Sequence, residues 1–169
     1  MIDSRDITID VATEETAPVL ASLLELYVEE LSGIFAILPG ADGRYGYDRL
    51  PLYWSNPDTH FAFYLRLRGQ AVGFALVTRG SPATDDPDDQ DLAEFFVLAS
   101  HRHVGVGRRA ALLLWNGLPG RWVVRVSEAN RDGLRFWESA IREYAGGAVT
   151  ISAYQGRLHV FRVFSFQKT

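Results

Sequence analysis

The chain contains no cysteine among its 169 residues. That absence excludes disulfide bonds, thiolate metal sites and a cysteine nucleophile, and it is typical of a reducing cytoplasm. No apolar run approaches the ~20 residues that span a bilayer. The first six residues also lack the apolar stretch of a signal peptide. We therefore expect a cytoplasmic protein that does not enter a membrane.

An excess of basic residues is also lacking. The chain has 17 Lys and Arg residues against 21 Asp and Glu residues, and its formal net charge is −4. Nucleic-acid binders usually carry a basic patch, so we expect no nucleic-acid partner. The composition is 47% hydrophobic, which at this length suits one globular core. We expect residues 1–169 to form a single domain.

The N-terminal half predicts a strand, a long helix and a hairpin. Alternation marks a strand at Ile7–Val11, and apolar residues at helical spacing mark a helix from about residue 14 to 31. Glycines and prolines interrupt residues 32–59, where we expect only a short helix near 47–54. Aromatic and β-branched residues predict strands at 60–67 and 70–78, joined by a turn at Arg68-Gly69.

The C-terminal half predicts strands alternating with helices. We expect a strand at 92–98, a helix at 108–116, a strand at 122–126, a helix that begins after Asn130 and ends at Gly146-Gly147, and a hairpin of strands 149–154 and 158–166. The segment from Gly80 to Asp91 carries five aspartates without calcium-loop spacing, which predicts a solvated loop. A minor alternative is that its charge attracts a cationic amine.

The turn before the helix at 108–116 is the most informative segment. Backbone N–H groups at the start of a helix lack intrahelical partners, and the helix dipole is positive there, so the turn suits a pyrophosphate. Gly105 and Gly107 permit close approach to the backbone. The same glycines and Ala110 also fit a dinucleotide-binding fingerprint. Six residues, 99–104, separate Gly105 from the preceding strand, which counts against that alternative.

Two motifs resemble those of the GNAT superfamily of N-acetyltransferases. Arg102-x-x-Gly105-x-Gly107 is similar to the family's Arg/Gln-x-x-Gly-x-Gly/Ala signature, and Asn130-x-x-Gly133-x-x-Phe136-Trp137 is similar to its Asn-x-x-Ala-x-x-Phe-Tyr. The motifs occur in the family's order, separated by one helix and one strand. The element order of the whole chain also resembles the family.

The resemblance implies an α/β (α+β) fold with a mixed, strongly twisted sheet of about seven strands and about four helices, splayed between the fourth and fifth strands. It also implies acetyl-CoA as the acyl donor. Backbone amides would hold its pyrophosphate, a strand would pair with its pantetheine arm, and Asn130 would lie near the thioester, as well as capping a helix. The implied cofactor-binding residues are Phe95, Phe96, Val97, Arg102, His103, Val104, Gly105, Val106, Gly107, Arg108 and Asn130.

Direct acetyl transfer needs a base for the amine and a proton for the leaving thiolate. Glu94 is the candidate base, because apolar neighbours would raise the pKa of its carboxyl. A structural or solvent-facing Glu94 is the alternative, with Glu128 in reserve. Trp137 occupies the position of the family's tyrosine, and an indole N–H is not a useful acid. Tyr144 is therefore our candidate acid, with Tyr154 or solvent as alternatives.

The remaining features are open to two interpretations each. His101-x-His103 lacks the partners of a metal site, so we expect no metal, and His60 and His159 are interpreted as structural. The aromatic residues at 45, 47, 53 and 54 favour packing over a substrate pocket. We expect a small-molecule or protein amine as acceptor, and the C-terminal hairpin offers an edge for a homodimer. An acyl-CoA sensor without turnover is the alternative function.

Overall fold

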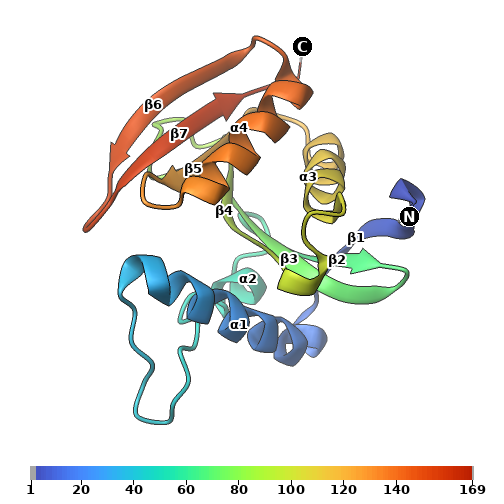
Figure 1. Ribbon diagram of the computed structural model, residues 1–169, viewed down its shortest axis with the longest axis vertical. Helices are drawn as coiled ribbons and strands as arrows, with labels where there is room; N and C mark the ends of the chain where they lie inside the picture. Colours follow the sequence, from blue (N-terminus) through green and yellow to red (C-terminus); the bar gives the residue numbers. More distant parts are fainter. Residues whose placement is uncertain (1–2, 169) are drawn as a thin grey trace.

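The structure is a computed structural model that describes residues 3–168 (Figure 1). Its strands are β1 (Ile7–Val11), β2 (His60–Leu67), β3 (Gln70–Arg79), β4 (Gln90–Val97), β5 (Trp122–Ser127), β6 (Val149–Gln155) and β7 (Val160–Phe166). They form one 7-stranded sheet in the order β1-β2-β3-β4-β5-β7-β6. Only the β4–β5 pair is parallel among the described strands. The expected mixed sheet is confirmed.

Four α-helices cover the two faces of this sheet. They are α1 (Ala17–Phe35), α2 (Leu52–Ser55), α3 (Val106–Gly117) and α4 (Arg131–Ala145). Buried residues of α1 and α2 pack with Phe74 and Leu76 of β3, whereas those of α3 and α4 pack on the face that carries Ala75 and Val77. Successive strand residues point to opposite faces, so covering both faces explains the continuous apolar run of β3.

The first long helix extends further than the sequence predicted. A short 3-10 helix, Glu14–Thr16, precedes α1, and α1 ends at Phe35 rather than near residue 31. The extra turn packs the Phe35 ring against the C-terminal hairpin, where it lies 4.7 Å from the His159 ring between centroids. This long-range contact has no counterpart in the local pattern, which is why the predicted end was wrong.

The expected solvated aspartate loop is only partly correct. Asp89 and Asp91 are almost completely buried. Asp89 pairs with Arg121 at 2.6 Å, and Asp91 pairs with Arg125 at 2.8 Å. Both arginines come from β5 or the residue before it, so the pairs join the start of β4 to β5. The partners lie more than thirty residues away in sequence, out of reach of a local pattern.

The strands β4 and β5 separate soon after these ion pairs. Their pairing covers only residues 90–92 of β4 and 122–124 of β5. Beyond Leu92, the edge of β4 that faces β5 has no neighbouring strand among the described residues. The gap divides the sheet into a β1–β4 part and a β5–β7 part (Figure 1). It opens at the strand that carries Glu94.

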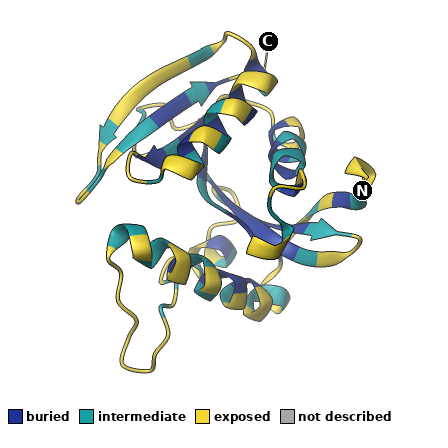
Figure 2. Cartoon of the chain, in the orientation of Figure 1, coloured by how far each residue is buried: buried dark blue, intermediate teal, exposed yellow. Residues whose placement is uncertain are grey.

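The opposite end of the sheet is left exposed. β6 is the outermost strand, and Thr150, Ile151, Ser152 and Ala153 are all exposed, as the yellow ribbon of β6 indicates (Figure 2). An exposed strand edge presents unpaired backbone groups to a partner. The expected homodimer therefore stays a prediction with a suitable edge.

Candidate active site

The separation of β4 and β5 opens a cavity of about 550 Å³. Its floor is β4, one wall comes from β5, α4 and the C-terminal hairpin, and the other wall comes from α1, α2 and the loop between them. A volume of this size is typical of a small-molecule site. The lining includes Tyr27, Phe35, Tyr47, Arg49, Leu52, Tyr53, Glu94, Phe95, Arg125, Asn130, Trp137, Tyr154 and Phe161.

Glu94 lies on the floor of this cavity. A β-bulge interrupts the pairing of β4 with β3, because Glu94 opposes Leu76 while Leu92 opposes Val77, which leaves Ala93 without a partner. The Tyr27 hydroxyl donates a hydrogen bond to Glu94 Oε2 at 2.6 Å, and the Tyr47 hydroxyl donates to Oε1 at 3.0 Å. A bulge of this kind changes the direction in which a side chain points. Each oxygen of the Glu94 carboxylate accepts one hydrogen bond.

Burial raises the pKa of the Glu94 carboxyl above its ordinary value, and the two tyrosine hydroxyls offset only part of that rise. The same burial, followed by the charge of Glu94, raises the pKa values of Tyr27 and Tyr47. The tyrosines therefore stay protonated as donors, while Glu94 is displaced toward the pH range in which a base exchanges protons. These pKa shifts suit a Glu94 that accepts a proton better than a Glu94 that stays permanently charged.

Sequence reasoning missed Tyr27 and favoured packing for Tyr47. Tyr27 fell within the apolar stripe of a helix, and its ring does pack on Phe74, at 5.5 Å between centroids. Its hydroxyl nevertheless has a polar partner. Helical periodicity could not have predicted this contact. The sequence did offer one sign of it, because a tyrosine on the buried face of a helix needs a hydrogen-bond partner for its hydroxyl.

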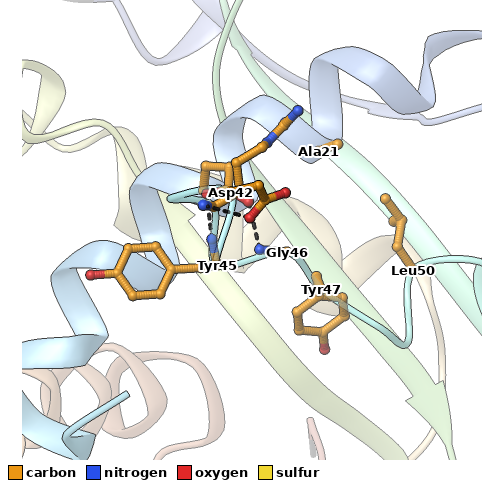
Figure 3. A pocket seen from close by; sticks show the side chains of 8 residues that line it. Ala21, Asp42, Tyr45, Gly46, Tyr47 and Leu50 are labelled. Atoms are coloured by element: carbon orange, nitrogen blue, oxygen red, sulfur yellow. Dashed lines mark hydrogen bonds between the residues drawn. The ribbon is translucent and has the colours of Figure 1, made fainter. Parts of the chain in front are cut away.

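The loop that carries Tyr47 is tied to α1 by Glu25. The Glu25 carboxylate accepts hydrogen bonds from the backbone N–H groups of Tyr45, at 2.9 Å, and Gly46, at 2.6 Å. Glu25 lines a second cavity of about 400 Å³, beside which Figure 3 shows Tyr45, Gly46 and the Tyr47 ring. The two amides lower the pKa of Glu25, so it stays charged at neutral pH. Glu25 thus fixes the backbone next to Tyr47.

The predicted phosphate turn lies between β4 and α3. His103 and Gly105 both have positive φ values, 62° and 92°, and α3 begins directly after Gly105. The backbone N–H groups from His103 to Arg108 make no hydrogen bond with the described part of the chain. Unpaired amides at a helix start are the groups that bind a phosphate. This turn is therefore able to accept an anion.

The arginines of this turn are engaged in contacts within the protein. Arg102 makes a two-bond contact with Glu30 of α1, at 2.6 Å for each bond, and its Nε donates to the Val97 carbonyl at 2.7 Å. Arg108 bonds Glu143 and Ser139 of α4. These side chains fix the position of the turn between α1 and α4, so an anion there would rely on the backbone.

Phe95 and Asn130 lie where the second predicted motif meets β4. Phe95 packs edge-on against Trp137, with 4.9 Å between ring centroids, on the sheet face opposite Phe96. Asn130 Oδ1 accepts a hydrogen bond from the Gly133 amide at 3.0 Å, which confirms its capping role. A Cβ at Gly133 would lie 2.6 Å from the Asn130 side chain, so glycine leaves room for this cap.

The structure places the two candidate acids differently. Tyr144 donates its hydroxyl to the Trp115 carbonyl at 3.2 Å and packs on Trp115, and it does not line the cavity. Tyr154 of β6 does line it. The reserve base, Glu128, forms an ion pair with Arg162 at 3.1 Å and is also absent from the lining.

Neither a metal cluster nor a membrane-spanning helix is found within residues 3–168. No group of three or more metal-ligating side chains occurs there. His60 packs against Tyr53 at 5.1 Å, in keeping with a structural role. None of the described helices combines the length and the apolar character needed to cross a bilayer.

Comparison with known proteins identifies the fold. No protein-family model and no curated protein matches the chain. The solved structure of AAC(6')-Ib with ribostamycin and coenzyme A is 15% identical, with a TM-score of 0.70 over 96% of this chain and 93% of that one. The ribosomal-protein-S18-alanine N-acetyltransferase of Escherichia coli is 15% identical, with a TM-score of 0.60 over 95% and 92%.

An acetyltransferase of Thermus thermophilus is 20% identical, with a TM-score of 0.60 over 94% of this chain and 96% of that one. The fold is that of the GNAT acetyltransferases, so the resemblance drawn from the two motifs is confirmed at the level of fold. A nucleotide dehydrogenase would need a largely parallel, doubly wound sheet. Since this sheet has one parallel pair, that alternative is wrong.

Proposed function

We propose that this chain is an N-acetyltransferase that transfers an acetyl group from acetyl-CoA directly to a primary amine of a small molecule or a protein. The observation that carries the proposal is the position of Glu94, which lies in a cavity opened by the split between β4 and β5. The turn with unpaired amides follows the same strand after a short 3-10 helix, Ala99–His101. One continuous segment, residues 90–108, thus joins a base to an anion site.

Acetyl-CoA would be held largely by the backbone. The amides from His103 to Arg108 suit its pyrophosphate, and the unpaired edge of Phe95 to Val97 suits the amides of its pantetheine arm, as an added strand would. Arg102 and Arg108 support the turn through their contacts with α1 and α4. Asn130 lines the cavity, and we propose that it contacts the cofactor near the thioester.

The substrate supplies an activated acetyl group as a thioester. Glu94, with its raised pKa, takes a proton from the amine. The amine nitrogen then forms a bond to the acetyl carbon, the carbon–sulfur bond breaks, and the thiolate takes a proton. Backbone N–H groups along the free edge of β4 stabilise charge on the acetyl oxygen. Of the tyrosines considered as acid, Tyr154 lines the cavity, whereas Tyr144 would need to act from outside it.

We also propose that residues 1–169 form a single domain, that the protein acts in the cytoplasm, and that the exposed edge of β6 joins two copies in a homodimer. The alternative of an acyl-CoA sensor uses the same turn. A base with two hydrogen-bond donors and a raised pKa has a use in turnover that a sensor does not need, so the enzyme is favoured.

Two measurements test this function. Isothermal titration calorimetry with CoA should show binding, and a thiol-reactive dye should report free CoA when acetyl-CoA and an amine panel are added. No heat and no thermal shift at millimolar CoA would overturn the cofactor assignment. Binding without thiol release for any small amine or peptide N-terminus would favour the sensor.

A further inference from the structure

One wall of the cavity is aromatic. It comes from α1, α2 and the loop between them, and Tyr53 of α2 is buried in the adjacent core. Phe35 at the end of α1 stacks on Phe161 of β7, with 6.4 Å between centroids and 14° between planes. This contact bridges the two parts of the sheet. Aromatic rings therefore border this side of the cavity.

The charge in this cavity is not that of a site for polycations. Among the described residues that line it, Glu94 is the one carboxylate. The other charged groups in the lining are arginines. Arg125 is already paired with Asp91, and Arg49 is exposed and makes no ion pair with the described residues. Within this lining, a second ammonium group on the acceptor would find no second carboxylate and would be repelled by Arg49.

The aspartates of the 80–91 segment do not supply the missing negative charge. The two nearest to β4, Asp89 and Asp91, are buried in their ion pairs with Arg121 and Arg125. The exposed aspartates at 85, 86 and 88 are absent from the cavity lining. Residues 80–91 line the cavity only through Pro82, so this segment adds no carboxylate to the lining.

From this juxtaposition of one carboxylate with an aromatic wall, we propose that the acceptor is a monoamine whose amino group is attached to an aromatic or similarly flat apolar group. The amino group lies at Glu94 and the apolar group packs against Tyr53, Phe35 and Phe161. The proposal rests on the acetyltransferase function and specifies its substrate class. Aromatic rings give such a site binding energy through burial and edge-to-face contacts.

The test compares acceptors at saturating acetyl-CoA. The kcat/KM for 2-phenylethylamine should exceed that for propylamine and for butane-1,4-diamine by about ten- to a hundredfold, as expected for burial of one ring. An equal or higher kcat/KM for the diamine, or for an aminoglycoside, would overturn the proposal while leaving the acetyltransferase function intact.

A charge reversal at the mouth of the cavity sharpens the test. Arg49→Glu should raise the ratio of kcat/KM for butane-1,4-diamine to that for 2-phenylethylamine by about three- to tenfold. The matched control is Arg79→Glu, since Arg79 is exposed and does not line the cavity. An equal response of the two variants would show that Arg49 does not face the acceptor.

Failure of the function and failure of the substrate class remain distinguishable. If no amine releases thiol, calorimetry in the presence of CoA still compares binding of 2-phenylethylamine with that of the diamine. Tighter binding of the aromatic amine would support the substrate class for the cavity even without turnover. Tighter binding of the diamine would reject it.

Discussion

The turn from Arg102 to Arg108 would bind the pyrophosphate of acetyl-CoA, and the cavity around Glu94 would bind the amine. The two regions would do so by different means. The turn offers backbone N–H groups, while its arginines are occupied with Glu30 and Glu143. The cavity relies on side chains, and Glu94 depends on tyrosines that are 67 and 47 residues away in sequence. Substitutions that change the chemistry of a side chain should therefore impair the function of the cavity. The turn should be impaired only by substitutions that change its backbone conformation.

The largest expected effect is on Glu94. Glu94→Gln removes the base and should lower kcat by about 10²–10³-fold, as loss of a general base does, while the Kd for CoA stays unchanged. Steady-state kinetics and calorimetry measure the two quantities. Glu128→Gln is the matched control, because Glu128 is half-exposed and paired with Arg162, and it should stay near wild-type activity. If Glu128→Gln proved the more damaging change, the reserve base would take the role.

The next effect should separate the turn from the cavity. Gly105 has φ of 92° and open space around its Cα, so Gly105→Ala adds conformational strain without a clash. We expect the Kd for CoA to rise about tenfold, from a strain of roughly 1–2 kcal/mol. Gly69→Ala is the matched control, since Gly69 has φ of 83° and equally open surroundings in the β2–β3 turn. An equal loss of CoA affinity in both variants would mean that strain acts only through general stability.

The pH profile should report the environment of Glu94. Because the folded-state pKa of Glu94 is raised, the acidic limb of kcat/KM should lie above the ordinary carboxyl range near ~4.3. Tyr47→Phe removes a donor to the ionised form, so the limb should move to still higher pH, with kcat/KM at pH 6 about three- to tenfold lower. Tyr45→Phe, which loses only a 3.4 Å contact with Ser32, should leave the limb in place.

The same raised pKa has a consequence for stability. The folded state binds the Glu94 proton more tightly than the unfolded state does, so the free energy of unfolding should fall as pH rises from the ordinary carboxyl pKa to the raised one. Glu94→Gln should remove this component of the slope, as denaturant titrations at several pH values would detect. An unchanged slope in Glu94→Gln would show that burial does not raise the pKa of Glu94.

The smallest expected effect concerns Glu25, which acts through the loop. Glu25→Gln keeps one acceptor oxygen for the amides of Tyr45 and Gly46 but loses the charge. We expect a two- to threefold decrease in kcat/KM and a small shift of the acidic limb in the same direction as Tyr47→Phe. Glu29→Gln, at an exposed position on α1, is the control. A decrease with no shift of the limb would indicate a purely structural role.

The sequence by itself determined the order of the strands and helices and the glycine turn before α3. These features depend on neighbours in the chain: apolar alternation, helix starts and stops, and glycines that leave backbone groups free. Even the capping of α4 by Asn130 was recognisable, because its partner Gly133 is only three residues away.

Only the tertiary structure decided the surroundings of Glu94. The sequence left its face of the sheet and its role open, and it did not predict that Tyr27 and Tyr47 would donate to it, that Glu25 would fix the loop, or that Asp89 and Asp91 would be buried. Each of these contacts joins residues that are distant along the chain. Local periodicity reports which residues share a face, but the chemistry of a side chain is set by the residues that pack against that face.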